Sequence, residues 1–151
     1  MSIESETFSN YSVRQDRLLE IRESCCRNQY FKSEQARRIC EFIYESYGCT
    51  PEFLWANIPS YAAFRLKETK KWYAIMGSVP RFKLDPASGD RREVEVVNVK
   101  VDSEQIQEIL SQPGYYPAFH LNKKCWVSII LEDALSDEEI RDSIRSSYAR
   151  V

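Results

Sequence analysis

The chain has 151 residues, the size of one compact domain with or without a short extension. Apolar residues make up 43% and charged residues 29% of the chain, proportions that exclude an intrinsically disordered protein. The 21 basic and 23 acidic side chains give a net charge of −2, which excludes a uniformly basic nucleic-acid coat but not a local basic surface.

Neither a membrane span nor a secretory signal is visible in the sequence. No segment approaches the about 20 consecutive apolar residues that cross a bilayer. The N-terminus lacks the basic and apolar regions of a signal peptide. The five cysteines form an odd set without a Cys-x-x-Cys pair, which favours reduced, mostly buried thiols over a disulfide framework. We therefore expect a cytoplasmic protein without a membrane partner.

Two helices are predicted in the first third of the chain. Residues 3–28 have helical spacing, with one side formed by Phe8, Tyr11, Leu18, Ile21 and Cys25. The second helix is predicted between Ser33, which suits the N-cap, and Gly48, which suits the left-handed position after the last turn. Its buried side is expected to comprise Ala36, Ile39, Cys40, Ile43 and Tyr47.

From Pro51 the hydrophobic pattern changes to the alternation typical of strands. The predicted strands are Phe53–Ala56, Tyr61–Lys67, Trp72–Ser78 and Glu93–Val101. Arg81–Leu84 and the turn at 85–90 extend the third and fourth strands into a long hairpin with a charged tip. In the fourth strand we expect Val97, Val99 and Val101 to face the core, and Asn98 and Lys100 to face water.

The last third is predicted to contain a short helix, a hairpin and a final helix. Asp102 is expected to cap the short helix, which buries Ile106, Ile109 and Leu110. The hairpin pairs Ala118–Leu121 with Cys125–Leu131, and Ser136 with Glu139 forms a capping box for the final helix. We expect Trp72 and Trp126 to be largely buried. The order of elements predicts an α+β, two-layer fold, an antiparallel sheet with helices on one face.

The chemistry-bearing residues do not form a recognisable catalytic or metal site. His120 is the only histidine, which excludes a pair of histidines. A Cys125–His120 nucleophilic pair lacks an orienting group, and a Cys25-Cys26-His120 zinc site lacks the usual ligand spacing. Phosphate-binding loops and nucleophile elbows are absent from the sequence. We therefore expect no enzymatic activity and no cofactor.

An acidic run precedes and opens the last predicted helix, at residues 132–133 and 137–139. It could hold a divalent cation weakly. The favoured interpretation is that its carboxylates complement the positive N-terminus of that helix.

The middle third of the chain is basic and the last third acidic. Residues 51–100 carry 9 basic and 6 acidic side chains, whereas residues 101–151 carry 5 and 9. The candidate nucleic-acid-binding residues flank three turns: Arg65, Lys67, Lys70, Lys71, Arg81, Lys83, Arg91, Arg92, Lys123 and Lys124. Basic side chains at the tips of hairpins can contact the phosphates of a nucleic acid. Lysines at sheet edges also protect strands from aggregation, and that interpretation stays open for each hairpin.

The run 120–126, His-Leu-Asn-Lys-Lys-Cys-Trp, resembles the C-terminal signature of the MmcQ/YjbR family. Further matching positions are Lys71–Ala74, Val99–Lys100, Pro113–Ala118, Leu131, Asp137 and Ser147–Tyr148. The resemblance covers about residues 33–150 and divides the chain into a helical extension at 1–32 and a YjbR-like domain at 33–151. It implies a two-layer fold similar to secretion chaperones and a double-wing DNA-binding role, and it transfers no catalytic residue.

Two functions are therefore predicted. The first is a non-enzymatic module that binds DNA weakly and salt-dependently through basic hairpins, its wings. The alternative is a protein-interaction or chaperone-like adaptor, which uses the N-terminal helix to bind another protein or a second copy of itself. Within one chain, that helix could instead cover its own sheet.

Overall fold

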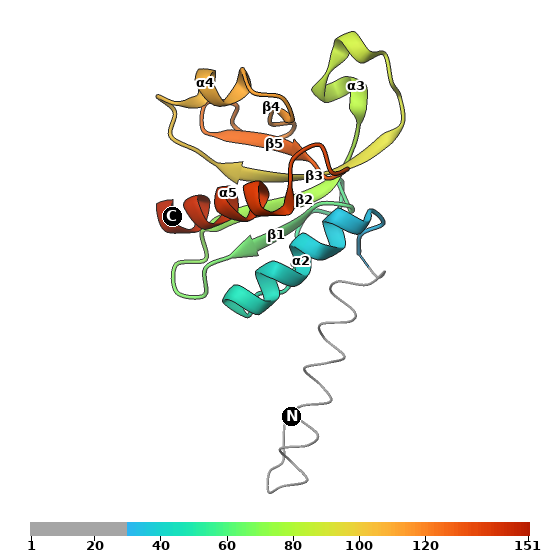
Figure 1. Cartoon of the computed structure of the whole chain (residues 1–151). Coiled ribbons are helices and arrows are strands. Elements are labelled where there is room, and N and C mark those ends of the chain that lie inside the picture. Colours follow the sequence, from blue (N-terminus) through green and yellow to red (C-terminus); the bar gives the residue numbers. More distant parts are fainter. Residues whose placement is uncertain (1–29) are drawn as a thin grey trace, which may run out of the picture.

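The computed structural model describes residues 30–151 (Figure 1). The predicted N-terminal helix, with Phe8, Tyr11, Leu18 and Ile21, lies outside these residues, as do Cys25 and Cys26. The described elements are α2 (Glu34–Tyr47), β1 (Ala62–Arg65), β2 (Trp72–Pro80), α3 (Arg81–Leu84), the 3-10 helix η2 (Pro86–Ser88), β3 (Glu93–Lys100), α4 (Ile106–Leu110), β4 (Tyr115–Pro117), β5 (Trp126–Ile130) and α5 (Asp137–Arg150). None of these helices is long and apolar enough to cross a membrane.

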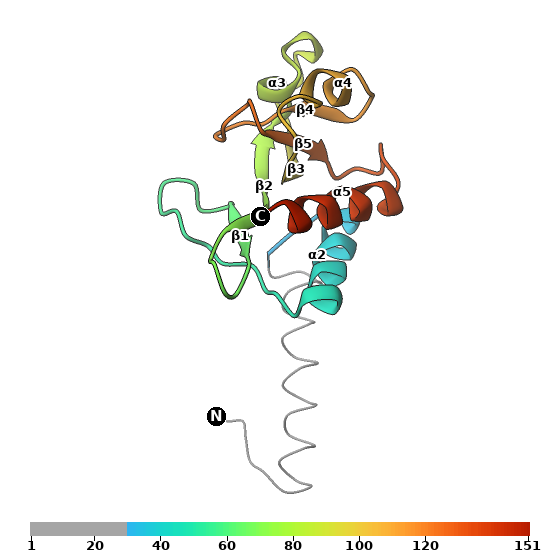
Figure 2. The ribbon, with the colours of Figure 1, turned by 90° about the vertical axis from the view of Figure 1, so that its left-hand side faces the viewer.

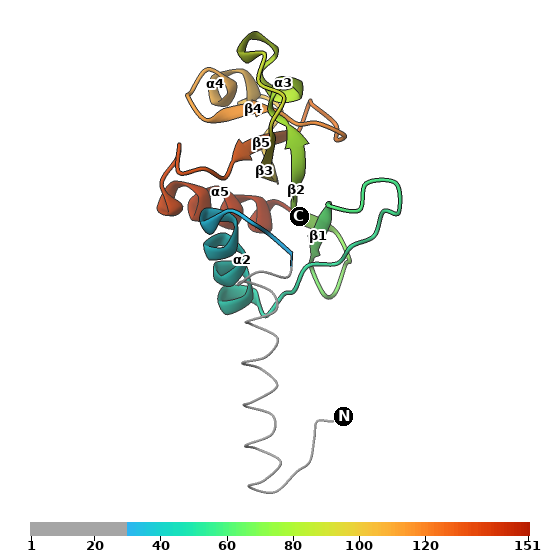
Figure 3. The ribbon, with the colours of Figure 1, turned by 90° about the vertical axis from the view of Figure 1, so that its right-hand side faces the viewer.

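The five strands form one antiparallel sheet in the order β1-β2-β3-β5-β4. Helices α2 and α5 lie side by side against one face of it (Figure 2 and Figure 3). The predicted α+β, two-layer architecture is confirmed. The order also fixes which loops meet, because antiparallel neighbours bring alternate connections to the same end of the sheet.

Local capping signals fix the two long helices as predicted. The Ser33 hydroxyl accepts a hydrogen bond from the Ala36 N–H (3.0 Å) at the start of α2, and Gly48 ends this helix at φ 64°. Ser136 and Glu139 form the expected capping box at the start of α5. Glu95 on β3 adds a long-range contact: its carboxylate accepts hydrogen bonds from the Lys32 and Ser33 N–H groups and thereby positions α2 on the sheet.

The main core fills the space between this helix pair and the sheet. Its fully buried members include Ile39, Ile43, Phe64, Met76, Val97, Val99, Ile129, Ile140 and Ile144. Such side chains contribute about 1.5–3 kcal/mol each on burial. The predicted burial of Ala36, Ile39, Cys40 and Ile43 is confirmed, while Tyr47 is partly exposed.

The second face of the sheet is covered by loops rather than by water. Residues 53–61 and 118–125 contribute side chains to a second cluster around Tyr61, Ile75 and Trp126. A β-carbon on Gly77 would collide with the Tyr61 ring, so glycine allows this ring to lie across β2. The prediction that Asn98 faces water is wrong because of this cover: Asn98 is fully buried and donates to the Ile75 carbonyl (3.0 Å).

Three predicted strands differ from the structure. Phe53–Ala56 is not a strand, because only Glu52 pairs with β1, through an isolated bridge to Ala63. The strand expected at Ala118–Leu121 lies at Tyr115–Pro117, and the chain then leaves the sheet to cover its second face. Arg81–Leu84 forms the helical turn α3 instead of extending the hairpin.

Two smaller predictions also need correction. Helix α4 begins at Ile106, after Gln105, and Asp102 accepts a hydrogen bond from the Glu104 N–H (3.0 Å) in the preceding turn instead of capping the helix. Trp126 is buried as expected at 7% exposure, but Trp72 is only partly buried, packed edge-on against Trp55.

Candidate functional site

A β-bulge in β2 places Tyr73 on the helix-covered face of the sheet. Phe64 pairs with Ala74 and Arg65 with Trp72, so Tyr73 is the extra residue on its strand. Bulges redirect side chains, and here Tyr73 joins the main core while Trp72 packs in the cluster on the opposite face. Tyr73 is fully buried.

The hydrogen bonds between β2 and β3 end beside this bulge, and Ser147 of α5 bonds the next backbone groups of both strands. Its hydroxyl donates to the Tyr73 carbonyl (2.6 Å) and accepts from the Lys100 N–H (2.9 Å), just beyond the last β2–β3 pair of Ala74 with Val99. Ser147 is itself fully buried. One hydroxyl therefore satisfies two backbone groups and ties α5 to the bulge.

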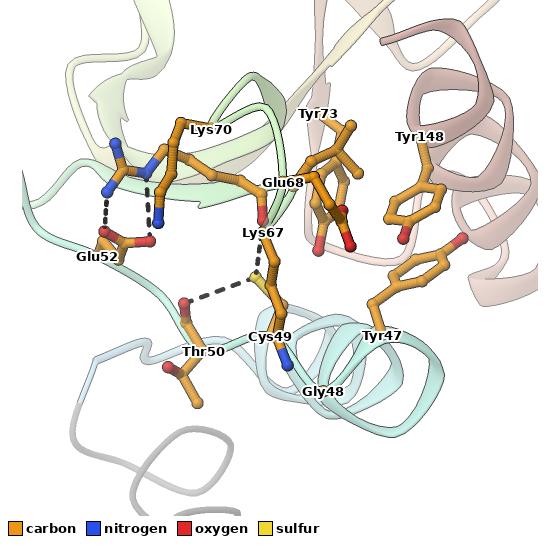
Figure 4. Close-up of a pocket in the computed structure, with 12 residues that line it drawn as sticks. Tyr47, Gly48, Cys49, Thr50, Glu52, Lys67, Glu68, Lys70, Tyr73 and Tyr148 are labelled. Atoms are coloured by element: carbon orange, nitrogen blue, oxygen red, sulfur yellow. Dashed lines mark hydrogen bonds and ion pairs between the residues drawn. The ribbon is translucent and has the colours of Figure 1, made fainter.

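Beside the bulge is a pocket of about 240 Å³, which we call the tyrosine pocket (Figure 4). It lies among the C-terminal end of α2, the segment that follows it, the β1–β2 turn and α5. Its lining residues are Tyr47, Gly48, Cys49, Thr50, Glu52, Arg65, Leu66, Lys67, Glu68, Lys70, Tyr73 and Tyr148.

Three aromatic rings form one wall of the tyrosine pocket. Tyr47 and Tyr148 stack with ring centroids 3.8 Å apart and an interplanar angle of 6°. Tyr73 meets both rings edge-on, at 5.5 and 4.9 Å. Burial raises the pKa of Tyr73 and of Tyr47, which keeps both phenols protonated at neutral pH.

The Tyr73 hydroxyl is buried, and within residues 30–151 it has no nitrogen or oxygen partner; the Cys49 thiol beside it is a weak hydrogen-bond contact. The Cys49 thiol also contacts the carbonyl oxygens of Thr50 (3.8 Å) and Arg65 (3.7 Å), so the phenol shares a weak partner with two backbone groups. Buried polar groups are almost always paired, so this hydroxyl marks the pocket as unusual.

Charged side chains surround the opening of the tyrosine pocket. Arg65 is neutralised by Glu52, with which it forms an ion pair. Lys67 and Lys70 are exposed, and none of the ion pairs found among residues 30–151 involves them. Glu68 is the opposing carboxylate. The pocket opening therefore carries a small net positive charge.

The sheet order brings two of the three basic turns to the same end of the sheet. The β1–β2 turn and the β4–β5 loop both lie where β3 ends. We call this region the lysine end and define it by five exposed residues, Lys67, Lys70, Lys71, Lys123 and Lys124. In the described chain, no ion pair involves any of them.

The third basic turn lies at the opposite end of the sheet, beyond β2 and β3 (Figure 1). We call it the α3 end and define it by Arg81, Lys83, Arg91 and Arg92. Three of these four cations, Lys83, Arg91 and Arg92, have local partners, unlike the cations of the lysine end. The ten candidate residues therefore do not form one surface.

The partners at the α3 end are a carboxylate and aromatic rings. Arg92 pairs with Asp90 (2.8 Å), and this pair lowers the Asp90 pKa to about 2. Arg91 and Lys83 lie 5.0 and 5.2 Å from the Phe82 ring centroid, a cation–π geometry.

The other candidate groups serve structural contacts. His120, at φ 71°, packs its ring edge-on against Tyr61, and no hydrogen bond within residues 30–151 joins it to Cys125. In the acidic run, Asp133 and Asp137 bind Arg38 of α2. Among the described residues, no three histidine, cysteine or acidic side chains are arranged to hold a metal ion.

Sequence reasoning missed Lys100 and the tyrosine wall. Lys100 ends β3 between the two lysine-bearing loops, with its ammonium 5.9 Å from the Trp126 ring centroid. Tyr47, Tyr73 and Tyr148 come from three separate elements. Of these, Tyr47 was singled out by its spacing within a helix, and that spacing indicated a core position rather than a pocket.

Comparisons with known proteins identify the relatives of this chain. A family model described as YjbR matches residues 38–150. The uncharacterized protein YyaQ of Bacillus subtilis (strain 168) is 30% identical over 110 residues, 73% of this chain and 92% of that protein. The uncharacterized protein YbdF of Escherichia coli O157:H7 is 32% identical over 69 residues, 44% of this chain and 55% of that protein.

Solved structures show the same fold. A crystal structure of a protein from Pseudomonas syringae matches with a TM-score of 0.66 at 32% identity, covering 71% of this chain and 90% of that chain. A solution NMR structure from the same organism has a TM-score of 0.63 at 31% identity, covering 72% and 86%. The family expected from residues 120–126 is thereby confirmed.

Proposed function

The chain belongs to the YjbR family, and we propose that it is a non-enzymatic, cytoplasmic protein that binds DNA through the lysine end of its sheet. The proposal rests on one observation. Folding brings two loops more than 50 residues apart in sequence to one end of the sheet, and their five lysines remain exposed and without ion pairs in residues 30–151.

The spacing of the two loops suits a phosphate backbone. Strands β2 and β5, which follow the loops, are separated by β3 alone. Neighbouring strands lie about 4.8 Å apart, so the nearest ends of the two loops are offset by about 10 Å across the sheet. DNA rises about 3.4 Å per nucleotide of one strand, and the offset therefore corresponds to about three nucleotides. The two loops are the proposed wings.

Acidic residues at the same end limit the strength of binding. Glu68 lies within the β1–β2 turn, and Asp102 and Glu104 follow β3. They partly offset the five lysines, so contacts should be few, and binding should be weak and largely independent of sequence.

Fluorescence anisotropy with a labelled duplex at low salt tests this proposal. We expect the Lys123→Ala/Lys124→Ala variant to bind at least tenfold more weakly than the native chain, because two phosphate contacts are lost. Lys83→Ala/Arg91→Ala removes two charges at the α3 end and is the matched control, with affinity expected within a factor of about two. Equal losses of DNA affinity in both variants would mean that binding depends only on the net charge of the protein, and would contradict the proposal.

A second candidate is the adaptor function, favoured by an exposed aromatic patch. Tyr30 and Phe53 lie with ring centroids 5.2 Å apart, and they and Leu54 are 41–43% exposed. Such a patch suits a protein contact. Light scattering on the intact chain and on a variant beginning at Tyr30 tests self-association. A dimer of the intact chain alone supports it, whereas two monomers contradict it.

A further inference from the structure

We propose that the tyrosine pocket binds a small organic anion, an aromatic molecule with a phosphate or carboxylate group. This site differs from the proposed DNA surface, because its main binding group is a buried hydroxyl rather than an exposed lysine. Lys67 and Lys70 border both.

The Tyr73 hydroxyl supplies the first argument. It is fully buried, lines the pocket and, within residues 30–151, has no nitrogen or oxygen partner and only the weak Cys49 thiol beside it. Leaving a buried hydroxyl without a strong partner is costly, so a site that keeps it has a use for it. Because burial raises its pKa, the phenol stays protonated and offers a hydrogen to an acceptor oxygen.

The position of that hydroxyl is fixed before any ligand arrives. The bulge directs Tyr73 into the space beside the helices, and Ser147 holds its carbonyl. The stacked rings of Tyr47 and Tyr148 support it from one side (Figure 4). A pre-organised donor binds without the entropic cost of ordering a flexible side chain.

The charges favour an anion over a cation. Lys67 and Lys70 have no counter-ion in the described chain apart from the nearby Glu68, since Glu52 is engaged by Arg65. At the end of α2, the Gly48 N–H caps the Tyr44 carbonyl (2.8 Å) and offsets part of the negative pole of that helix. Phenol and ammonium donors together match the acceptor oxygens of a phosphate or carboxylate.

The size of the pocket restricts the ligand. Its volume of about 240 Å³ is below the roughly 300–1,000 Å³ of drug-sized sites and corresponds to about eight water molecules at about 30 Å³ each. A single ring with one acidic group fits this space, and its ring can pack against the tyrosines. A DNA duplex cannot enter it.

Two-dimensional NMR titration of the full chain tests the proposal with three probes: phenyl phosphate, benzoate and phenol. We expect saturable chemical-shift changes at Gly48, Cys49 and Lys67 with phenyl phosphate or benzoate. The probe with the higher affinity identifies the acidic group that the pocket prefers. Phenol, which lacks the charge, should bind at least tenfold more weakly. No saturable binding of either aromatic anion, or equal binding of phenol, would overturn the proposal.

Tyr73→Phe removes only the hydroxyl and is the decisive variant. We expect about a tenfold weaker affinity for the aromatic anion, with an unchanged or higher Tm of the free protein, since a buried hydroxyl without a strong partner is lost. Tyr116→Phe on β4, outside the pocket, is the matched control and should bind normally. An unchanged affinity in Tyr73→Phe would contradict the proposal.

The proposed DNA binding and the proposed anion binding can be tested independently of each other. Lys123→Ala/Lys124→Ala should weaken DNA binding and leave the aromatic anion bound, and Tyr73→Phe should do the reverse. Loss of both ligands in either variant would show a single shared site and would overturn the separate pocket.

Discussion

The two ends of the sheet use basic residues in opposite ways. At the α3 end, Arg92 pairs with Asp90, while Arg91 and Lys83 lie over the Phe82 ring. At the lysine end, the five lysines are exposed and form no ion pair within residues 30–151. A basic residue is available to a polyanion only when its own fold leaves it unpaired, so a count of charges along the sequence does not locate a binding surface.

The largest effect on the free energy of unfolding is expected from the buried hydrogen bonds of Ser147, which lie behind the lysine end. Ser147→Ala should lower the free energy of unfolding by about 1–3 kcal/mol, because the Tyr73 carbonyl and the Lys100 N–H both lose their partner. Ser88→Ala at the α3 end also removes a hydroxyl bonded to a carbonyl, that of Asp85, but in an exposed turn, and should have little effect. Urea denaturation measures both, and equal effects would remove the distinction between the two ends.

Acid should weaken the contacts of two aspartates, one of them at the α3 end. Arg92 lowers the pKa of Asp90, and Arg38 lowers that of Asp137. A lowered pKa contributes stability above the pKa of the unfolded chain, about 3.9, which is lost as the pH falls through the folded value. We expect stability to decline from about pH 4 downward.

The acid prediction is checked by urea denaturation between pH 2 and pH 7. Asp137→Asn should show a smaller decline than the native chain, because the Arg38 contact no longer titrates. An identical decline in both proteins would contradict the assignment.

The smallest effect is expected for Arg92→Ala. Its partner Asp90 is two residues away in an exposed turn, and exposed ion pairs contribute little to stability. Differential scanning fluorimetry should show an almost unchanged Tm, and DNA affinity should stay within a factor of about two. A large fall in affinity would mean that the α3 end takes part in binding.

Local signals made much of the fold predictable. The N-caps Ser33 and Ser136 and the terminal Gly48 act through neighbouring residues, so the sequence around them suffices to place α2 and α5. The family also followed from a local run, residues 120–126.

Nonlocal contacts explain what could not be predicted. Asn98 alternates with valines and was expected in water, but two distant loops cover that face. The Tyr73 bulge depends on pairing with β1 and on Ser147, 74 residues away. The candidate lysines were visible in the sequence, whereas their division between two ends depends on the order of the strands.

The salt dependence of DNA binding at the two ends tests the central claim most directly. Three to five phosphate contacts predict a slope of log affinity against log salt of about −2.7 to −4.5 for the native chain, at about −0.9 per contact. Lys123→Ala/Lys124→Ala should flatten the slope by about 1.8, whereas Lys83→Ala/Arg91→Ala should leave it unchanged. The same slope in all three proteins, or no binding at low salt, would contradict the account.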